Sequence, residues 1–321
     1  MTAKDAAPGH HGPTLAEARG YTLIDCRACG FAHVVPLPDP EALARAYREA
    51  YYSQEKPDAL AHQTEDRAWL DLVHGERAAL LAEHLGGARG KRILDVGCGG
   101  GFFLDACRRA GFAVHGVEPA RQAAAHARDV LGLAVTEGFL DDAAAAALPR
   151  FDAVHAAEVL EHLPDPAGML RRIHGLLAPG GLLLVSLPND GNPLQAAAER
   201  ALALPPWWLA PPHHLNYFTP ASIAALLARQ GFQVLEAQAS FPMELFLLMG
   251  DNYVGDPALG RACQAKRKAF ELAMDAAGLS GLKTRLYQAL AGLGIGRTVV
   301  TLARRVAHPR RPGQAGTAME E

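Results

Sequence analysis

The sequence lacks three features that mark particular classes of protein. Among its 321 residues, no uninterrupted apolar run approaches the roughly 20 residues that cross a bilayer. Lysine and arginine do not exceed the acidic residues, at 31 against 34, so no global basic charge favours nucleic acid or anionic lipid. Cysteine is scarce and its count, five, is odd, which favours reduced thiols and a cytoplasmic setting over a disulfide scaffold. Half of the residues are hydrophobic, as in a globular chain that buries a large core.

Composition divides the chain into four regions. Residues 1–60 form an N-terminal region whose start, 1–13, is polar, predicted to be disordered, and unlike a signal peptide. Residues 61–240 form the core, including a Pro- and aromatic-rich acceptor lid at 189–218. Residues 241–307 hold a helical insertion and a strand-like return near 298–302, for which a continued helix is the alternative. Residues 308–321 are predicted to form a disordered tail.

Strand and helix patterns alternate through the core. Such alternation predicts an α/β fold: a Rossmann-like, seven-stranded, mostly parallel sheet with helices on both faces. The short N-terminal region and the later helical insertion are appended to it. The predicted strands are 91–96, 112–118, 133–136, 151–157, 182–187 and 232–238, and the predicted helices are 66–85, 101–110, 120–131, 141–147 and two that begin at Pro166 and Pro220.

A glycine-rich turn follows the first of these strands. Asp95 ends the strand, and glycines follow at 97, 99 and 101. A dinucleotide-binding loop would place its last glycine at position 102, which is Phe102, so an NAD-dependent oxidoreductase is disfavoured. No lysine follows as in a nucleotide P-loop, and Asp95 would repel a pyrophosphate but suits an ammonium or sulfonium group. Glu118 ends the next strand, where an acidic residue binds ribose hydroxyls. The pattern predicts a nucleoside ligand with a small charged tail.

At these residues the chain resembles the class I S-adenosylmethionine-dependent methyltransferases, over about residues 65–240. Leu94–Gly101 is similar to their first motif, and the segment 158–166 resembles the ubiquinone-biosynthesis O-methyltransferase-like subfamily. The resemblance implies S-adenosyl-L-methionine as cofactor. The cofactor-binding residues that it implies are Asp95, Gly97, Cys98, Gly99, Gly101, Glu118, Pro119, Gly138, Phe139, Leu140 and Glu158.

Histidines and carboxylates near the acceptor side are candidates for the reaction. In related small-molecule methyltransferases a histidine just before the sixth helix lies at the acceptor pocket, so His213 or His214 is expected to serve as general base, with His162 a further candidate. Glu158, Glu161 and His162 match an E-x-x-E-H pattern that in quinone O-methyltransferases is implied in binding a divalent cation. Alternatively, Glu158 orders the cofactor loop and the other two stabilise the turn.

A pair of cysteines lies near the N-terminus. Cys26-x-x-Cys29 resembles the second half of a zinc ribbon found on some sugar C-methyltransferases. The upstream cysteine pair is absent, and His10, His11 or His33 would have to complete the four ligands of a structural zinc. The alternative is a degenerate ribbon with two free thiols.

The sequence therefore predicts an enzyme that transfers a methyl group to a small-molecule acceptor by in-line displacement. A sugar, a quinone or phenol, and a natural-product intermediate all remain candidates, and so do O-, C- and N-methylation. A methyltransferase for RNA or protein is the first alternative, although the charge balance counts against RNA. A noncatalytic S-adenosylmethionine-binding regulator is the second. The expected partner is the small-molecule acceptor, with no nucleic acid and no membrane span.

Overall fold

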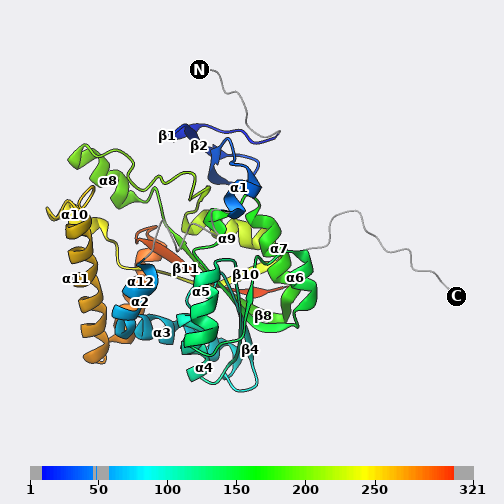
Figure 1. Cartoon of the computed structure of the whole chain (residues 1–321). Coiled ribbons are helices and arrows are strands. Elements are labelled where there is room, and N and C mark those ends of the chain that lie inside the picture. Colours follow the sequence, from blue (N-terminus) through cyan, green and yellow to red (C-terminus); the bar gives the residue numbers. More distant parts are fainter. Residues whose placement is uncertain (1–8, 46–47, 49–57, 307–321) are drawn as a thin grey trace.

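The computed structural model describes residues 9–45, 48 and 58–306, which are organised around two sheets (Figure 1). The larger sheet has seven strands in the order β10-β11-β8-β7-β4-β5-β6, and the smaller has four in the order β1-β2-β3-β9. Strands β4 to β8 run parallel, whereas β11 is antiparallel to both of its neighbours. The strands are β1 (Thr14–Ala18), β2 (Tyr21–Cys26), β3 (Phe31–Val35), β4 (Arg92–Val96), β5 (Ala113–Glu118), β6 (Val135–Glu137), β7 (Phe151–Ala157), β8 (Leu177–Pro188), β9 (Asn216–Tyr217), β10 (Phe232–Ala239) and β11 (Thr298–Arg305).

Helices cover both faces of the larger sheet, and α11 stands at the edge of the molecule (Figure 1). None of the described helices is long and apolar enough to cross a bilayer. The helices are α1 (Pro40–Arg45), α2 (Ala59–Glu65), α3 (Arg67–Leu85), α4 (Phe102–Arg109), α5 (Arg121–Ala125), a π-helical turn (His126–Val130), α6 (Asp142–Ala147), a 3-10 turn (Leu160–His162), α7 (Pro166–Leu176), α8 (Pro193–Leu202), α9 (Pro220–Arg229), α10 (Glu244–Leu248), α11 (Pro257–Ala276) and α12 (Ser280–Gly292).

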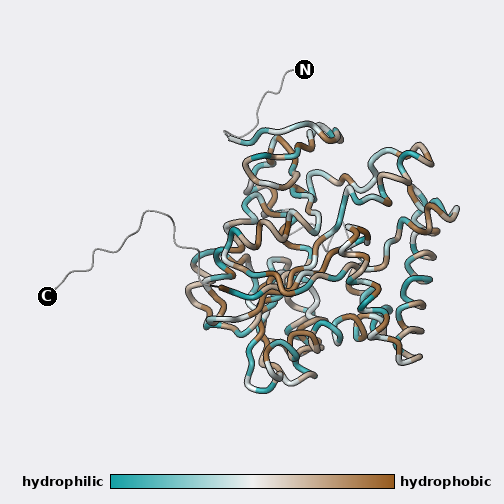
Figure 2. The backbone as a smooth tube through the Cα atoms, turned by 180° about the vertical axis from the view of Figure 1, so that it is seen from behind, coloured by the Kyte–Doolittle hydropathy of each residue, from teal (hydrophilic) through white to brown (hydrophobic). Residues whose placement is uncertain are grey.

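Successive residues of β8 point to opposite faces of the sheet, and both faces are buried. Leu182 and Leu184 pack with α3 and α4, whereas Leu183 and Val185 pack with α7 and α9. A strand buried on both sides must be apolar at nearly every position, which explains the continuous Leu/Val run of this segment. Figure 2 shows the same pattern as hydrophobic central strands enclosed by helices of mixed polarity.

The structure confirms the predicted α/β fold and also places the late strand. Strand β11 lies between β8 and β10, so the strand-like reading of 298–302 is correct. Three details differ from the prediction. The helical span predicted over 120–131 is observed as α5 followed by a π-helical turn from His126 to Val130, and the strand predicted over 182–187 begins earlier, at Leu177. Residues 9–13 are placed rather than disordered, since His11 and Pro13 accept backbone hydrogen bonds from Arg27 and Asp25.

Some predictions fall outside the described residues. They concern residues 1–8 and the tail from residue 308.

Candidate functional site

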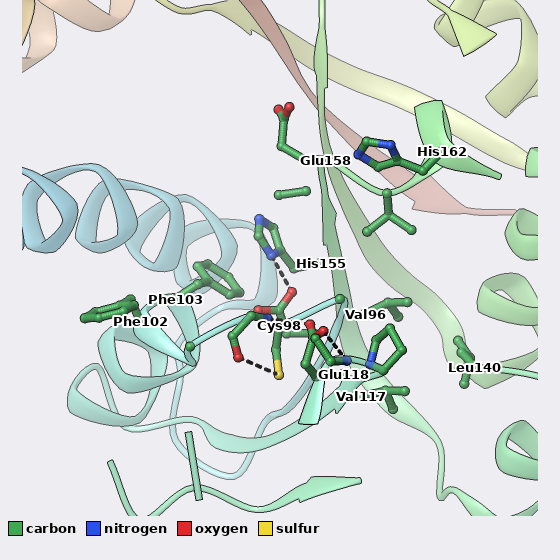
Figure 3. A pocket seen from close by; sticks show the side chains of 18 of the residues that line it. Val96, Cys98, Phe102, Phe103, Val117, Glu118, Leu140, His155, Glu158 and His162 are labelled. Carbon is green, nitrogen blue, oxygen red and sulfur yellow. Dashed lines mark hydrogen bonds and ion pairs between the residues drawn. The ribbon is translucent and has the colours of Figure 1, made fainter. Parts of the chain in front are cut away.

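A cavity of about 330 Å³ lies at the carboxyl ends of β4, β5 and β7, the edge where open α/β sheets bind ligands. Figure 3 shows Val96, Cys98 and Glu118 on one side of it and Glu158 and His162, from the chain that follows β7, on the other. We call it the donor cavity. The predicted cofactor residues that line it are Asp95, Gly97, Cys98, Gly99, Glu118, Pro119, Gly138, Phe139, Leu140 and Glu158.

The glycines of the first turn have separate roles. Gly97 has a φ of 70°, and a Cβ atom there would lie 2.8 Å from the Val159 side chain, so only glycine lets the loop close over this wall. Gly101 does not line the cavity, contrary to its predicted role as a ligand residue. A Cβ on Gly101 would lie 2.7 Å from Leu133 and 2.9 Å from Ala127, so this glycine lets α4 begin close to the neighbouring helix.

Glu118 is distant from the glycine loop in the sequence, but in the fold it is hydrogen-bonded to that loop. Its carboxylate accepts hydrogen bonds from the backbone N–H groups of Gly99 and Ala120, each at 2.8 Å. Burial nevertheless raises the pKa of Glu118 to about 7, because the two hydrogen bonds offset the loss of hydration only in part. Each carboxylate oxygen retains a lone pair for a further donor such as a ribose hydroxyl.

Asp95 belongs to a buried polar chain that the sequence did not reveal. His155 Nδ1 lies 2.7 Å from Asp95 Oδ1, and Arg77 Nη1 lies 3.4 Å from His155 Nε2. A guanidinium can only donate, so His155 carries its proton on Nδ1 and donates it to Asp95. Burial lowers the pKa of His155, which keeps the ring neutral. The ring thereby fixes the orientation of the Asp95 carboxylate at the wall of the donor cavity.

A cluster of titratable groups follows β7. Glu158 has a φ of 55°, a strained conformation for a residue other than glycine, and such strain is concentrated at functional sites. Its carboxyl lies against that of Glu161, which is 1% exposed and whose two oxygens lack a well-formed hydrogen bond. Burial, and after it the neighbouring Glu158, raises the pKa of Glu161 well above its usual value. Two carboxyl groups this close titrate as a pair and favour sharing a proton.

His162 lines the donor cavity beside this pair. Its Nδ1 lies 2.6 Å from the backbone oxygen of His213, and a carbonyl only accepts, so Nδ1 carries the proton and the lone pair is on Nε2. Nε2 is 3.8 Å from Glu161 Oε1. The His214 ring packs edge-on against His162 with centroids 5.0 Å apart, and its Nδ1 lies 3.8 Å from the buried Asp190 carboxylate. The side chain of His213 is exposed.

The segment 213–217 is fastened to the turn that carries these groups. Asn216 donates from its side-chain nitrogen to the carbonyl oxygens of Leu160 and Leu163, both at 2.8 Å. The backbone N–H of Leu215 donates to the carbonyl oxygen of Glu161 at 2.7 Å. The predicted acceptor lid thus reaches the candidate catalytic groups through its last residues.

A second cluster, at the smaller sheet, has the donor set of a zinc site. The ligand atoms of His10, Cys26, Cys29 and His33 all lie within 4.8 Å of one another. His10 Nδ1 is 3.0 Å from His33 Nε2, 3.4 Å from Cys29 Sγ and 3.7 Å from Cys26 Sγ. A tetrahedron with zinc bonds of 2.0–2.3 Å has edges of about 3.3–3.8 Å. The distances from His10 to the two cysteines fall in this range, and the distance to His33 is slightly shorter, so the cluster approaches the geometry of one Zn²⁺ site. His33 Nδ1 donates to the Val34 carbonyl oxygen at 3.1 Å, which turns the lone pair on Nε2 toward the cluster.

Comparison with known proteins decides the family. Residues 60–237, more than half of the chain, match the family described as methyltransferase domain. The chain belongs to this methyltransferase family. A ubiquinone biosynthesis O-methyltransferase from Alkalilimnicola ehrlichii is 39% identical over 118 residues, which cover 35% of this chain and 48% of that protein. One from Aeromonas salmonicida is 32% identical over 201 residues, 58% of this chain and 83% of the relative.

The first of these alignments spans about half of the relative's length. A solved chain from the complex between the Haloferax volcanii Trm112 methyltransferase activator and a methyltransferase has a TM-score of 0.50 at 20% identity, covering 84% of this chain and 100% of that chain. At this identity the likeness concerns the fold alone. S-adenosylmethionine is the cofactor of this methyltransferase class, and the site offers what that molecule requires: a buried carboxylate for its ribose, a second acid for its charged tail, and a close glycine turn.

The structure places most of the predicted site residues around the donor cavity, and the others lie away from its lining. Among the described residues, the candidate cation ligands that converge are Glu161, His162 and His214, within 4.8 Å, and Glu158 is not in that set. The donor cavity also has lining residues that sequence reasoning missed. In the sequence, His155 is a polar residue within a mostly apolar strand. Its role at the cavity becomes visible only when β7 pairs with β4 and places it beside Asp95. The other missed residues are Gln63, Leu70, His74, Val96, Gly100, Phe102, Phe103, Val117, Ala120, Ala157, Val159, Leu163 and Met169.

Proposed function

We propose that the protein transfers a methyl group from S-adenosylmethionine to an oxygen atom of a small-molecule acceptor. The observation that carries this proposal is the position of Glu158, which lines the donor cavity and also borders a second, larger cavity. The curated O-methyltransferase relatives support oxygen as the acceptor atom.

S-adenosylmethionine supplies an electrophilic methyl group when bound. Glu118 would accept hydrogen bonds from the ribose hydroxyls, and Asp95, oriented by His155, would bind the positively charged end of the molecule. Gly138, Phe139 and Leu140 line the cavity as the wall for the adenine. These residues would hold the donor at the wall that Glu158 shares with the second cavity.

Removal of the acceptor's proton is assigned to Glu158. Methyl transfer needs an aligned, deprotonated oxygen, and Glu158 lies on the wall shared by the two cavities, where its carboxylate can accept the acceptor's proton. Glu161 and His162 lie beside Glu158, so a proton taken by Glu158 can be shared within the cluster. His213 contributes its carbonyl oxygen, which fixes the ring of His162, and His214 packs behind that ring.

A divalent cation is the second candidate occupant of this cluster. The buried, poorly hydrogen-bonded oxygens of Glu161 and the nearby nitrogens of His162 and His214 are suitable ligands, and a cation there would replace the shared proton and stabilise an acceptor oxyanion. Activity measured after removal of divalent metals, and again after Mg²⁺ or Mn²⁺ is restored, separates the two. Loss and recovery support the cation, and unchanged turnover removes it.

The cluster of His10, Cys26, Cys29 and His33 is assigned to a structural zinc ion. Burial lowers the pKa of His33, which favours the neutral imidazole that metals bind. His33 is the partner of Asn216 in the pairing of β3 with β9, and Asn216 holds the turn that carries Glu161 and His162. Zinc at this site would therefore stabilise the catalytic turn indirectly, through the pairing of β3 with β9.

The proposed function is tested with S-adenosylmethionine that carries an isotopically labelled methyl group. The protein is incubated with this donor and a metabolite extract, and labelled products are identified by mass spectrometry. We expect a labelled small molecule whose new methyl group is an ether or ester. Label only in protein or RNA, or a labelled product methylated on carbon or nitrogen, would contradict the proposal.

A further inference from the structure

A second cavity, of about 600 Å³, lies beside the donor cavity (the flank cavity below). It is enclosed by α3, α11 and α12 on one side and by the ends of β7, β8, β10 and β11 on the other. Gln63, Leu70, His74, Ala157 and Glu158 line both cavities, so the two share a wall at the point where a transferred methyl group would leave. Its size lies within the range of small-molecule sites.

Among the described residues that line the flank cavity, Arg77 is the cation without an ion pair. Lys283 is paired with Glu76 at 2.8 Å, and Arg267 is paired with Glu271 at 3.3 Å. Among the described residues Arg77 forms no ion pair: its Nη2 donates to Ser186 Oγ at 3.2 Å and its Nη1 to His155 Nε2 at 3.4 Å, and both partners are neutral.

A guanidinium has five N–H donors, so most of those of Arg77 remain for a ligand. An arginine stays charged even when buried, and a buried charge without a partner costs several kcal/mol in general. Glu158, Asp95 and Glu271 attract the guanidinium, but none of them lies within ion-pair distance of it, so they compensate its charge only in part. Glu236 accepts a hydrogen bond from Gln238 at 3.2 Å, and Glu83 is exposed to solvent.

Resting on the proposed function, we infer that the flank cavity binds the methyl acceptor and that the acceptor carries a carboxylate, which pairs with Arg77. The planar fork of arginine matches a carboxylate in a bidentate arrangement. A doubly charged phosphate is less suitable, because Glu158, Glu236 and the paired Glu76 and Glu271 border the same space. An apolar acceptor would leave Arg77 unbalanced. The remaining polar lining can bind hydroxyl or similar groups, and it includes Gln63, Ser186, Gln238, Ser240, Thr284 and Thr298.

The first test measures binding to the protein loaded with S-adenosylhomocysteine. Two pairs of probes differ only in charge: 3,4-dihydroxybenzoate against 3,4-dihydroxybenzamide, and glucuronate against glucose. We expect the acid to bind at least about tenfold more tightly in one pair, since a charge-assisted hydrogen bond contributes about that factor or more. In Arg77→Met the preference for the acid falls below about twofold. In Arg77→Lys, which keeps the charge but not the fork, it is intermediate.

Arg267→Met is the matched control, because it removes an arginine from the same cavity whose charge Glu271 already balances. It should keep the preference for the acid. The preference is the ratio of the two affinities within one variant, so any change in donor affinity that Arg77 causes through His155 and Asp95 cancels from it. No preference for either acid, or a preference that survives in Arg77→Met, would overturn the inference.

The second test uses the labelled products of the metabolite experiment. A labelled product that binds to an anion exchanger and gains the mass of an ester on carboxyl derivatisation supports the inference. A labelled product that is neutral, cationic or a phosphate overturns it while the proposed function stands. Absence of any labelled product overturns the proposed function, and this inference with it.

Discussion

The ionisation of Glu118 should make donor binding depend on pH. The carboxylate has a pKa of about 7 without ligand, because burial raises it. The ribose hydroxyls donate to the ionised form, and protonation removes acceptor capacity. Since the folded-state pKa lies above the usual value, the ionised form that binds the donor is present above about pH 7 and is lost as the pH falls through that value.

The magnitude follows from the fraction that is ionised. With a pKa of about 7, Glu118 is about 90% ionised at pH 8 and about 10% ionised at pH 6. A charge-assisted hydrogen bond contributes about 1.5–3 kcal/mol, a factor of about 10 to 150 in affinity. The change in affinity between about pH 8 and about pH 6 is therefore limited by the change in the ionised fraction of Glu118. The Kd of S-adenosylhomocysteine should rise about tenfold between about pH 8 and about pH 6.

Calorimetric titration over this range measures the effect, with Glu118→Gln as the control. The glutamine keeps the size of the side chain but cannot ionise. The Kd of the variant for S-adenosylhomocysteine should therefore exceed that of the wild type at pH 8, and it should change with pH only as far as groups on the ligand titrate. Groups on the ligand titrate equally with both proteins, and the difference between the proteins isolates Glu118. A wild-type Kd that is constant within about twofold, or a Glu118→Gln variant with the same pH dependence as wild type, would refute the reasoning.

Three further outcomes are expected. Glu158→Gln should lower kcat by about 10²- to 10⁴-fold in a steady-state methyl-transfer assay and leave the Kd of S-adenosylhomocysteine nearly unchanged; an equal loss in both would assign Glu158 to donor binding instead. Gly101→Ala should destabilise the fold by about 1–3 kcal/mol in denaturant unfolding, because its Cβ meets Leu133 and Ala127, whereas Gly75→Ala in α3, where a Cβ has open space, should not destabilise it. Cys29→Ser should lower the zinc content measured by elemental analysis and reduce kcat more than donor affinity, since the zinc cluster supports the catalytic turn through His33 and Asn216; a full zinc content in the variant would disprove the assignment.

The fold and the donor-side residues were predictable because their signals lie in consecutive residues. An acid at a strand end, a glycine turn and a second acid one strand later have fixed places in a parallel sheet, so the positions of Asp95 and Glu118 at one edge of the sheet could be predicted without coordinates. Helix starts at Pro166 and Pro220 were equally readable, because each follows a capping side chain.

The acceptor side could not be predicted, because packing between distant segments creates it. Arg77 reads as a surface charge on a helix, and only the arrangement of α3, α11 and α12 over the sheet places it in a cavity. The sequence limited the partners of the two cysteines to three histidines but could not choose among them. The hairpin of β2 and β3 places His33 at the cluster and the chain before β1 places His10 there, whereas His11 Nδ1 pairs with the Gly9 carbonyl oxygen.

The central claim is that the donor cavity holds S-adenosylmethionine with its methyl group directed at Glu158 and the flank cavity. A crystal structure with S-adenosylhomocysteine tests this most directly. We expect the ribose hydroxyls on the carboxylate of Glu118, the amino acid end near Asp95, and the sulfur facing the wall formed by Ala157 and Glu158. A ligand bound elsewhere, or bound in this cavity with its sulfur directed away from that wall, would contradict the account.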